Sequence, residues 1–295
     1  MLSILIPTYH YNVYPLAQEL EKQALNLGIA FELICMDDGS FSPLNAINQG
    51  INTLTNCTFI ENKTNVGRIA TRQLLAQKAQ YNWLLFLDAD VMPKNSGFLK
   101  FLANEIQAGT DAKDAIFGGI VYDPASYTPQ NSLRFTFGKN REESNATKRN
   151  KHPYKTVLSA NMLVKKPVFS VIPELENRHL YGLDYLLGSI LKKKRYHIKH
   201  IDNPVYHYGL EDNPTFLDKT QQALNNLHKM SIEHKMGPNQ VSILKAYTVL
   251  KSLRLNKLFN LIVFGFKNSL EKNLLGAKPN LFLFDLYRLA YLCGL

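Results

Sequence analysis

WLLFLDADVMP, residues 83–93, joins a continuous apolar run to two aspartates one residue apart, Asp88 and Asp90. A short apolar run without polar alternation is typical of a strand that is buried on both faces of a parallel sheet. Ligands of such sheets bind beyond the carboxyl ends of the strands, and the two aspartates follow the strand at that end. The stretch therefore predicts an α/β fold with an acidic site at one edge of its sheet.

The residues before this stretch alternate between strand-like and helical patterns. A helix is expected over residues 15–28, because Leu16, Leu20 and Leu27 recur at helical spacing before Gly28, and another over residues 67–79. Strands separated by helices indicate a mainly parallel sheet flanked by helices. The other strand-like runs are LSILIP at residues 2–7, FELICM at 31–36 and CTFIE at 57–61.

Composition limits the class of protein. A chain of 295 residues with 45% hydrophobic residues is long enough for one large domain and an appendage. Lys and Arg number 34 against 24 Asp and Glu, and this charge of +10 favours an anionic partner, whether nucleic acid, nucleotide phosphate or acidic lipid. Charge alone does not choose among these three.

Localisation signals are few. The first strand-like run follows Met1 directly, so we expect no cleaved signal peptide. Cys35, Cys57 and Cys293 are odd in number and form no Cys-x-x-Cys pair, which favours free thiols in a reducing cytoplasm. No apolar run approaches the roughly 20 residues that span a bilayer, so any membrane contact is expected to be peripheral.

Acidic clusters follow two of the predicted strands, with Asp37 and Asp38 after one and Asp88 and Asp90 after another. Carboxylates gathered at one edge of a sheet repel each other unless a cation or hydrogen-bond donors neutralise them. Oxygen ligands of this type suit Mg²⁺ or Mn²⁺, which bind through one or two carboxylates together with substrate phosphates. The alternative is that an Asp-rich turn simply ends each strand.

The chain contains, in this order, the segments SILIPTYHY, ELICMDDGS, NVGRIATRQLLAQKA and WLLFLDADVMP. Together these four segments resemble the inverting glycosyltransferases of family two, which have the GT-A fold, a Rossmann-like, mainly parallel sheet flanked by helices. The resemblance covers about residues 1–217 and implies transfer of a sugar from a nucleotide-sugar donor, with UDP favoured, to a hydroxyl of a saccharide or glycolipid acceptor in surface polysaccharide biosynthesis. The later pattern HIDNPVYHYGLEDN is similar to a bacterial subgroup.

The resemblance implies a donor site. Pro7, Tyr9 and Asp38 are expected at the base, because a ring can stack on Tyr9 and the Asp38 carboxylate can accept from the N3–H of uracil. Arg68, at a helix start, is expected at a phosphate, and Asp88 at the ribose or the metal. The alternatives are an aromatic lid on the core for Tyr9 and a solvated helix residue for Arg68.

The same resemblance implies a site for Mn²⁺ or Mg²⁺. Asp88 and Asp90 are its expected carboxylate ligands, and His207, after a short strand, is a further ligand or a diphosphate contact. A buried histidine satisfied by backbone groups is an equally good interpretation of His207.

The catalytic carboxylate is expected in the segment YGLDYLL, where Asp184 matches the family's general base. An inverting transfer needs one carboxylate to take a proton from the acceptor hydroxyl. Leu183 replaces the family's glutamate, so a nucleotide-sugar-binding protein with impaired catalysis stays open, as does an N-cap role for Asp184. Asn161, in VLSANMLVKKPVF, is expected on the acceptor side.

Two regions lack the family's motifs. Residues 124–155 are polar and poor in periodicity, which predicts either a mobile insertion over the site or a solvated loop. From residue 221 onward the pattern is helical and basic, so we expect a catalytic domain over residues 1–220 and a helical region over 221–295. That region either contacts an anionic membrane surface or packs as an appendage.

Two other functions are less consistent with the residues. A nucleotidyltransferase would carry a Gly-rich loop after its first strand, and PTYHYN contains no glycine. A nucleic-acid-binding module would explain the charge, but the basic residues gather late in the chain, away from aromatic strand patterns. We therefore expect no nucleic-acid partner.

Overall fold

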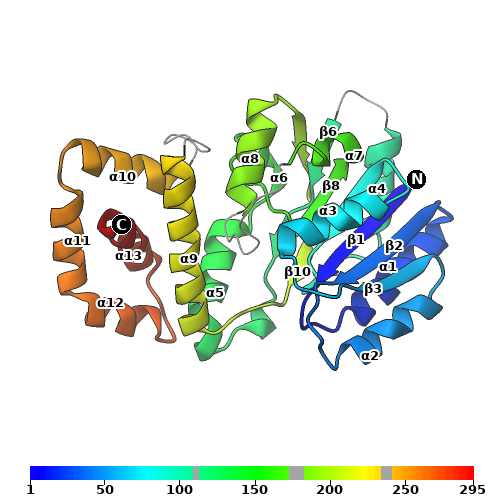
Figure 1. Ribbon diagram of the computed structural model, residues 1–295, viewed down its shortest axis with the longest axis horizontal. Coiled ribbons are helices and arrows are strands. Elements are labelled where there is room, and N and C mark those ends of the chain that lie inside the picture. The colour runs from blue at the N-terminus through cyan, green and yellow to red at the C-terminus, as the bar shows by residue number, and fades with distance from the viewer. Residues whose placement is uncertain (109–112, 173–182, 234–240) are drawn as a thin grey trace. The chain divides into compact units, whose positions relative to one another are not determined.

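The computed structural model describes residues 1–108, 113–172, 183–233 and 241–295 (Figure 1). A seven-stranded sheet lies at the centre of the N-terminal part. Its strands follow the order β3-β2-β1-β4-β8-β6-β9. Their bounds are β1 Leu2–Thr8, β2 Phe31–Asp37, β3 Cys57–Glu61, β4 Trp83–Leu87, β6 Lys113–Phe117, β8 Asn161–Lys165 and β9 His197–His200.

The sheet is mainly parallel, as the sequence predicted. Strands β3, β2, β1 and β4 run in one direction, while β8 is antiparallel to both of its neighbours, β4 and β6. Strand β1 is buried along almost its whole length, which explains its continuous apolar run. The parallel register pairs Thr8 with Asp37, so the chain leaves β1 and β2 at the same edge.

Helices cover this sheet. Helix α1 ends where Gly28 adopts a left-handed conformation with φ 60°, as the glycine at the end of the helical pattern predicted. Helix α3 packs on β1 and β2, and α1 packs on α4. The helices are α1 Tyr14–Leu27, α2 Asn45–Asn48, α3 Arg68–Lys78, α4 Phe98–Gln107 and α7 Lys166–Phe169, with a 3₁₀ helix, η1, at Gln49–Thr53.

A second, three-stranded sheet contains β5 (Val91–Pro93), β10 (Val205–His207) and β7 (Ile120–Val121). Strand β10 is antiparallel to β5 and parallel to β7. Its register places His207 opposite Val91, the residue after Asp90. This short sheet therefore brings the HIDNPVYH segment to the carboxyl edge of β4.

The expectation of an irregular insertion over residues 124–155 was wrong. The segment forms short helices, and Leu133, Arg134 and Arg149 within it are buried. Helices of one or two turns carry too few residues to show a helical period, which is why the sequence pattern missed them. They are η2 Pro124–Ser126, η3 Pro129–Asn131, α5 Ser132–Phe137, the π-helical turn η4 Gly138–Glu142 and α6 Ala146–Asn150.

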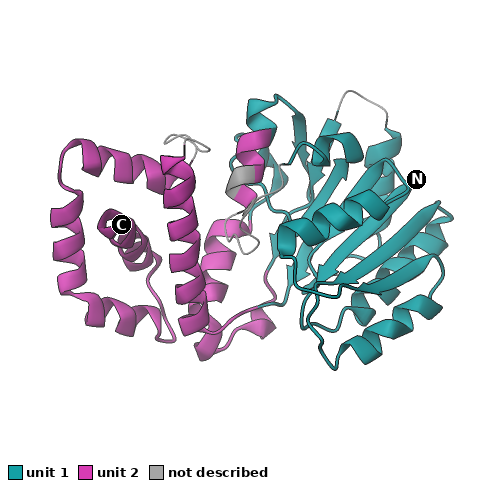
Figure 2. Cartoon of the chain, in the orientation of Figure 1, with its two compact units in different colours: residues 1–121, 144–179, 191–209 teal, residues 122–143, 180–190, 210–295 magenta. Residues whose placement is uncertain are grey.

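The chain divides into two compact units, coloured separately in Figure 2. Unit 1 contains residues 1–121, 144–179 and 191–209, and unit 2 contains residues 122–143, 180–190 and 210–295. The expected boundary after residue 220 falls inside α9 (Asn213–Ile232). The division into a catalytic domain over residues 1–220 and a helical region over residues 221–295 stays a prediction.

Unit 2 is helical, as the sequence predicted for its last part. Its last helix, α13 (Leu281–Gly294), contacts α9, α10, α11 and α12, and Figure 1 shows it enclosed by them. None of the described helices is long and apolar enough to cross a membrane. The remaining helices are α8 Leu183–Lys193, whose first residues belong to this unit, α10 Ser242–Ser252, α11 Asn256–Gly265 and α12 Lys267–Leu274.

Candidate active site

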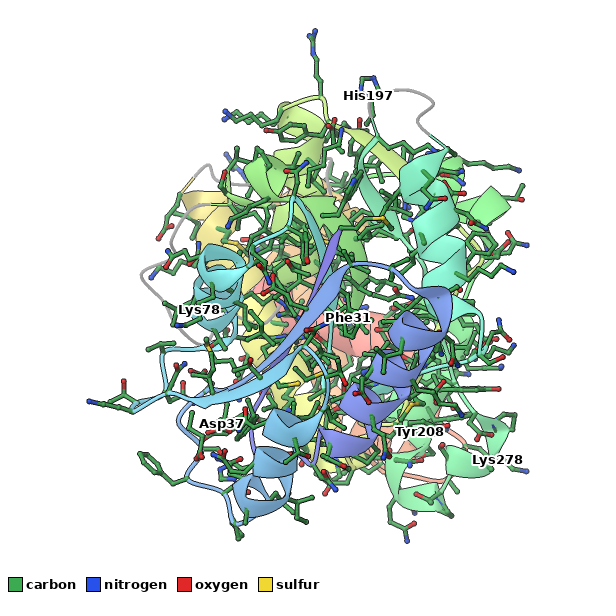
Figure 3. The ribbon with its side chains drawn as sticks, turned by 90° about the vertical axis from the view of Figure 1, so that its right-hand side faces the viewer. Phe31, Asp37, Lys78, His197, Tyr208 and Lys278 are labelled. Atoms are coloured by element: carbon green, nitrogen blue, oxygen red, sulfur yellow. The ribbon has the colours of Figure 1, made fainter. Side chains whose placement is uncertain are left out.

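The Asp37–Asp38 turn ends β2, whose two ends are labelled Phe31 and Asp37 in Figure 3. The Asp37 carboxylate accepts from the Ser40 N–H at 2.8 Å and from the Ser40 hydroxyl at 2.6 Å. Gly39 has φ 66°, and a Cβ there would lie 2.4 Å from the backbone carbon of Thr64, so only glycine fits this turn. Asp37 therefore holds the turn itself.

Asp38 is buried and joins this turn to the start of α3. Its two carboxylate oxygens accept from the backbone N–H groups of Val66, at 2.8 Å, and Gly67, at 2.9 Å. Its own N–H donates to the Thr8 carbonyl at 2.9 Å. Asp38 thus connects the ends of β1 and β2 with the N-terminus of α3, where the sequence predicted the nucleotide base and phosphate.

Asp88 directly follows β4, and its carboxylate lies between two arginines of α3. The Nη2 atoms of Arg68 and Arg72 donate to its two carboxylate oxygens, one to each. Burial raises the pKa of Asp88, but the two guanidinium charges outweigh it and lower that pKa to about 2. Arg72 is buried and Arg68 is 53% exposed at its side chain, so one arginine is structural and the other faces solvent.

Arg72 was not predicted from the sequence. It lies one helical turn after Arg68, and side chains four residues apart share a helix face. That spacing, immediately before a strand that ends in an aspartate, was the available signal.

Asp90 lies beside His207. The distance from Asp90 Oδ2 to His207 Nε2 is 3.8 Å, and the carboxylate is partly exposed. The pairing is fixed by the small sheet and by a hydrogen bond from the Tyr208 N–H to the Asp90 carbonyl at 2.9 Å. A Cβ at Gly209 would lie 1.7 Å from Asp90 Oδ2, so this glycine leaves the space that the carboxylate occupies.

Aromatic side chains follow β1 at the same edge. Tyr9 is 51% exposed, and its ring lies edge-on to that of His10 at 4.4 Å. Pro7, still within the strand, pairs with Met36. Burial and then the charge of Asp90 raise the pKa of Tyr11, which places this phenol near the carboxylate. Tyr9 is therefore not buried in the core, and its stacking on a base stays a prediction.

Asn161 starts β8 and is buried. Its amide nitrogen donates to the carbonyls of Gly119, at 2.9 Å, and Asn203, at 3.0 Å. Gly119 directly precedes β7 and Asn203 lies two residues before β10, so these bonds hold together the starts of two neighbouring parallel strands. A contact of Asn161 with the acceptor stays a prediction.

Asp184 lies in the first turn of α8 and is half-buried. The residues just before Leu183, which open this helix in the predicted motif, lie outside the described ranges. Its role as general base stays a prediction.

The residues at Asp90 fit a divalent ion in part. Among the described residues, no group of three or more His, Cys, Asp or Glu side chains could hold a metal. Both oxygens of Asp88 already accept from arginines, so Asp88 as a metal ligand stays a prediction. Two ligands that each lie about 2.1 Å from one ion are roughly 3–4 Å apart. The separation of 3.8 Å between Asp90 and His207 matches this range.

Solved structures share the fold. The mannosyltransferase PcManGT from Pyrobaculum calidifontis gives a TM-score of 0.54 at 14% identity, over 81% of this chain and 66% of that chain. Glucosyl-3-phosphoglycerate synthase from Mycobacterium tuberculosis gives 0.52 at 12% identity, over 78% of each chain. S. aureus TarS gives 0.51 at 19% identity, over 78% of this chain but only 43% of TarS.

Sequence comparison is more specific. No curated protein sequence matches the chain significantly. The profile described as Glycosyl transferase family 2 matches residues 3–169, more than half of the 295 residues. This range includes β1 from its second residue onward, the Asp37–Asp38 turn, α3 and the Asp88–Asp90 turn. The chain therefore belongs to glycosyl transferase family 2, and it is a glycosyltransferase with the GT-A fold, as its motifs predicted.

Proposed function

We propose that the chain transfers a sugar from a nucleoside diphosphate donor, with UDP favoured, to a hydroxyl of a saccharide or glycolipid acceptor, with inversion at the anomeric carbon. The observation that carries the proposal is the arrangement after β4, where Arg68 and Arg72 hold Asp88 and His207 lies 3.8 Å from Asp90. In a sugar transferase, this combination of cationic donors and an acidic pair suits a sugar diphosphate.

Structures of similar fold support a nucleotide-sugar donor. TarS has been solved in complex with UDP-GlcNAc, with a TM-score of 0.50. The Mycobacterium tuberculosis synthase was solved with Mn²⁺ and UDP, and PcManGT with GDP-Man and Mn²⁺. Because both uridine and guanosine donors occur, the base has to be measured on this chain.

The base would lie against Tyr9, beyond Pro7. Asp38 is already engaged by two backbone N–H groups, but each carboxylate oxygen has a second lone pair. It can therefore accept from the N3–H of uracil while it keeps both backbone bonds. In this arrangement the carboxylate positions the α3 N-terminus and reads the base.

Arg68 would contact the diphosphate. Two arginines and one aspartate give the cluster of Arg68, Arg72 and Asp88 a net charge of +1, which attracts an anionic group. The exposed guanidinium is that of Arg68, at the N-terminus of a helix, where phosphates are favoured. Asp88, fixed by both arginines, is then oriented to accept from the ribose.

Asp90 and His207 would hold Mn²⁺ or Mg²⁺, with the remaining positions filled by water and diphosphate oxygens. The bound ion would offset the charge of the diphosphate as it leaves. Gly209 supports this assignment because it lets the Asp90 carboxylate lie beside the imidazole.

Asp184 would act as the general base that takes the proton from the acceptor hydroxyl. Leu183, which replaces the family's glutamate, favours a second candidate, a donor-binding protein with impaired catalysis. The first candidate requires turnover and the second requires only binding. We place the reaction in surface polysaccharide or glycolipid assembly, in the cytoplasm, with the C-terminal helices at an anionic membrane face.

Calorimetry tests the donor site. We expect UDP to bind more tightly than GDP, and only with Mn²⁺ or Mg²⁺ present. Asp90→Ala should remove the dependence on the ion, while Asp218→Ala, an exposed carboxylate on α9, should behave like the wild type. Equal affinity with and without the ion in the wild type would reject the metal site.

A further inference from the structure

Helix α11 differs from the other helices of the C-terminal region because none of its residues is buried. Leu258, Leu261 and Ile262 are 52%, 71% and 56% exposed. Their spacing of three and four residues puts them on one face of the helix. Phe266, four residues after Ile262 and 68% exposed, extends this face beyond the end of α11.

The opposite face of α11 is anchored. The Asn260 amide donates to the Ala290 carbonyl of α13 at 2.8 Å, and the ring of Phe264 lies edge-on to that of Tyr287 at 5.5 Å. The helix is therefore fixed by one side to its own unit, and it presents the apolar residues of the other side to solvent.

Exposed basic residues lie before, within and after α11 in the sequence. The sequence contains no Asp or Glu between Glu233 and Glu271. Within that interval the exposed basic residues next to α11 are Lys251, Arg254, Lys257 and Lys267. An apolar helix face with a basic border suits the boundary between the headgroups and the acyl chains of an anionic bilayer.

We propose that α11 docks on an anionic phospholipid surface, with Leu258, Leu261 and Ile262 among the upper acyl chains and the basic side chains at the headgroups. The inference rests on the membrane location in the proposed function, and assigns it to one helix. A second copy of the chain suits this face less well, because a two-fold interface would set the basic borders of both copies against each other.

Vesicle flotation of the full chain tests the proposal. We expect binding to vesicles of phosphatidylcholine with phosphatidylglycerol, much weaker binding to phosphatidylcholine alone, and loss of binding at high salt. Lys251→Gln, Arg254→Gln and Lys257→Gln together should weaken binding to the anionic vesicles about 100-fold, at about fivefold for each charge. Lys22→Gln, Lys78→Gln and Lys100→Gln, all exposed in unit 1, are the matched control and should leave binding unchanged.

The apolar face has its own variants. Leu258→Ser with Ile262→Ser should weaken vesicle binding at least about tenfold. Ile47→Ser with Phe101→Ser is the matched control, since these side chains are 50% and 43% exposed in unit 1. Equal loss in both pairs would overturn the assignment to α11.

Two other results would also overturn the proposal. One is equal recovery of the wild type from anionic and neutral vesicles. The other is a dimer in solution that Leu258→Ser with Ile262→Ser dissociates, without vesicle binding by the wild type. UDP binding, measured on the same preparations, keeps this outcome separate from the donor site, because a chain that binds UDP but not vesicles would contradict only the membrane inference.

Discussion

Two acidic turns lie at the same edge of the sheet, and they differ in what neutralises them. After β2, Asp37 and Asp38 accept hydrogen bonds from nearby backbone and hydroxyl groups. After β4, Asp88 accepts from two arginine side chains, and Asp90 lies next to a histidine. The carboxylates of the first turn are neutralised by hydrogen bonds from backbone and hydroxyl groups. Those of the second turn lie beside ionisable side chains of α3 and β10.

This difference separates the carboxylates that hold the backbone, of which Asp38 would also contact the base, from the Asp90 carboxylate, which holds no backbone group of the described residues by its side chain. A buried carboxylate that accepts from backbone N–H groups stabilises the fold, and its removal leaves those donors unsatisfied. A partly exposed carboxylate beside an imidazole contributes little to stability and can exchange its neighbours for an ion or a substrate. An aspartate after a parallel strand can thus stabilise the fold or bind a ligand.

A third carboxylate extends the comparison and carries the largest expected effect. As the general base, Asp184 should be needed for turnover and not for donor binding. We expect Asp184→Asn to lower turnover by roughly 10²–10⁴-fold. UDP release with the preferred donor, including slow transfer to water, measures turnover, and calorimetry measures UDP affinity.

Asp212→Asn is the matched control. Asp212 caps α9 by accepting from the Thr215 N–H at 2.8 Å, and asparagine caps a helix about as well. If Asp184 were only a cap, both variants would turn over like the wild type. Loss of UDP binding in Asp184→Asn would instead indicate a role in donor binding or folding.

The next largest expected effect is on the free energy of unfolding, which Asp38→Ala and Asp90→Ala should lower by different amounts. Asp38→Ala removes two charge-assisted hydrogen bonds from a buried site, and we expect it to lower the free energy of unfolding by about 3 kcal/mol. Asp90→Ala should lower it by less than about 1 kcal/mol, because the side chain is partly exposed and its neighbour is 3.8 Å away. Urea denaturation measures both. Equal destabilisation by the two variants would remove the distinction between the two turns.

The sequence predicted the strands whose pattern is local. Each of β1, β2, β3 and β4 contains five to seven residues, enough for an apolar run to be recognised. Strands β5, β7 and β10 contain two or three, and they pair segments that are distant in the sequence. No periodicity can reveal such a sheet, although it decides where His207 lies.

The contacts within the site also depend on packing between distant segments, which the local sequence pattern does not show. Asp88 and Asp90 were identified by their position after an apolar run, and His207 by its place after a short strand in a segment that resembles a bacterial subgroup of the family. The structure brings Asp90 and His207 together. Spacing could not show that both oxygens of Asp88 bind arginines, because that depends on how α3 packs on the sheet. Nor could it show the burial of Asn161, whose amide holds backbone carbonyls.

A smaller effect is expected from pH, which tests whether Arg68 and Arg72 stabilise the ionised carboxylate of Asp88. The folded state lowers the pKa of Asp88 from 3.8 to about 2, so its contribution is complete above the ordinary pKa and is lost as the pH falls through about 2. We expect the stability difference between the wild type and Asp88→Asn to shrink by about 2 kcal/mol between about pH 5 and pH 2. Urea denaturation at several pH values measures it. A difference that does not change with pH would show that the arginines do not stabilise the ionised carboxylate.

The smallest expected effect comes from Gly209→Ala, which changes the space around the Asp90 carboxylate and leaves its charge unchanged. In Gly209→Ala the new methyl group would overlap Asp90 Oδ2, which lies 1.7 Å from the position of its Cβ. A side-chain carboxylate can rotate away, so we expect the free energy of unfolding to change by less than about 1 kcal/mol. The rotation moves the carboxylate away from the imidazole of His207, and the ion-dependent affinity for UDP should fall about tenfold, or about 1.4 kcal/mol.

Gly97→Ala, where no atom lies within 4 Å of the new Cβ, is the control. If Gly209→Ala bound UDP and the ion as tightly as the wild type, the position of the Asp90 carboxylate would not matter to ion binding. The assignment of the metal site to Asp90 and His207 would then be wrong.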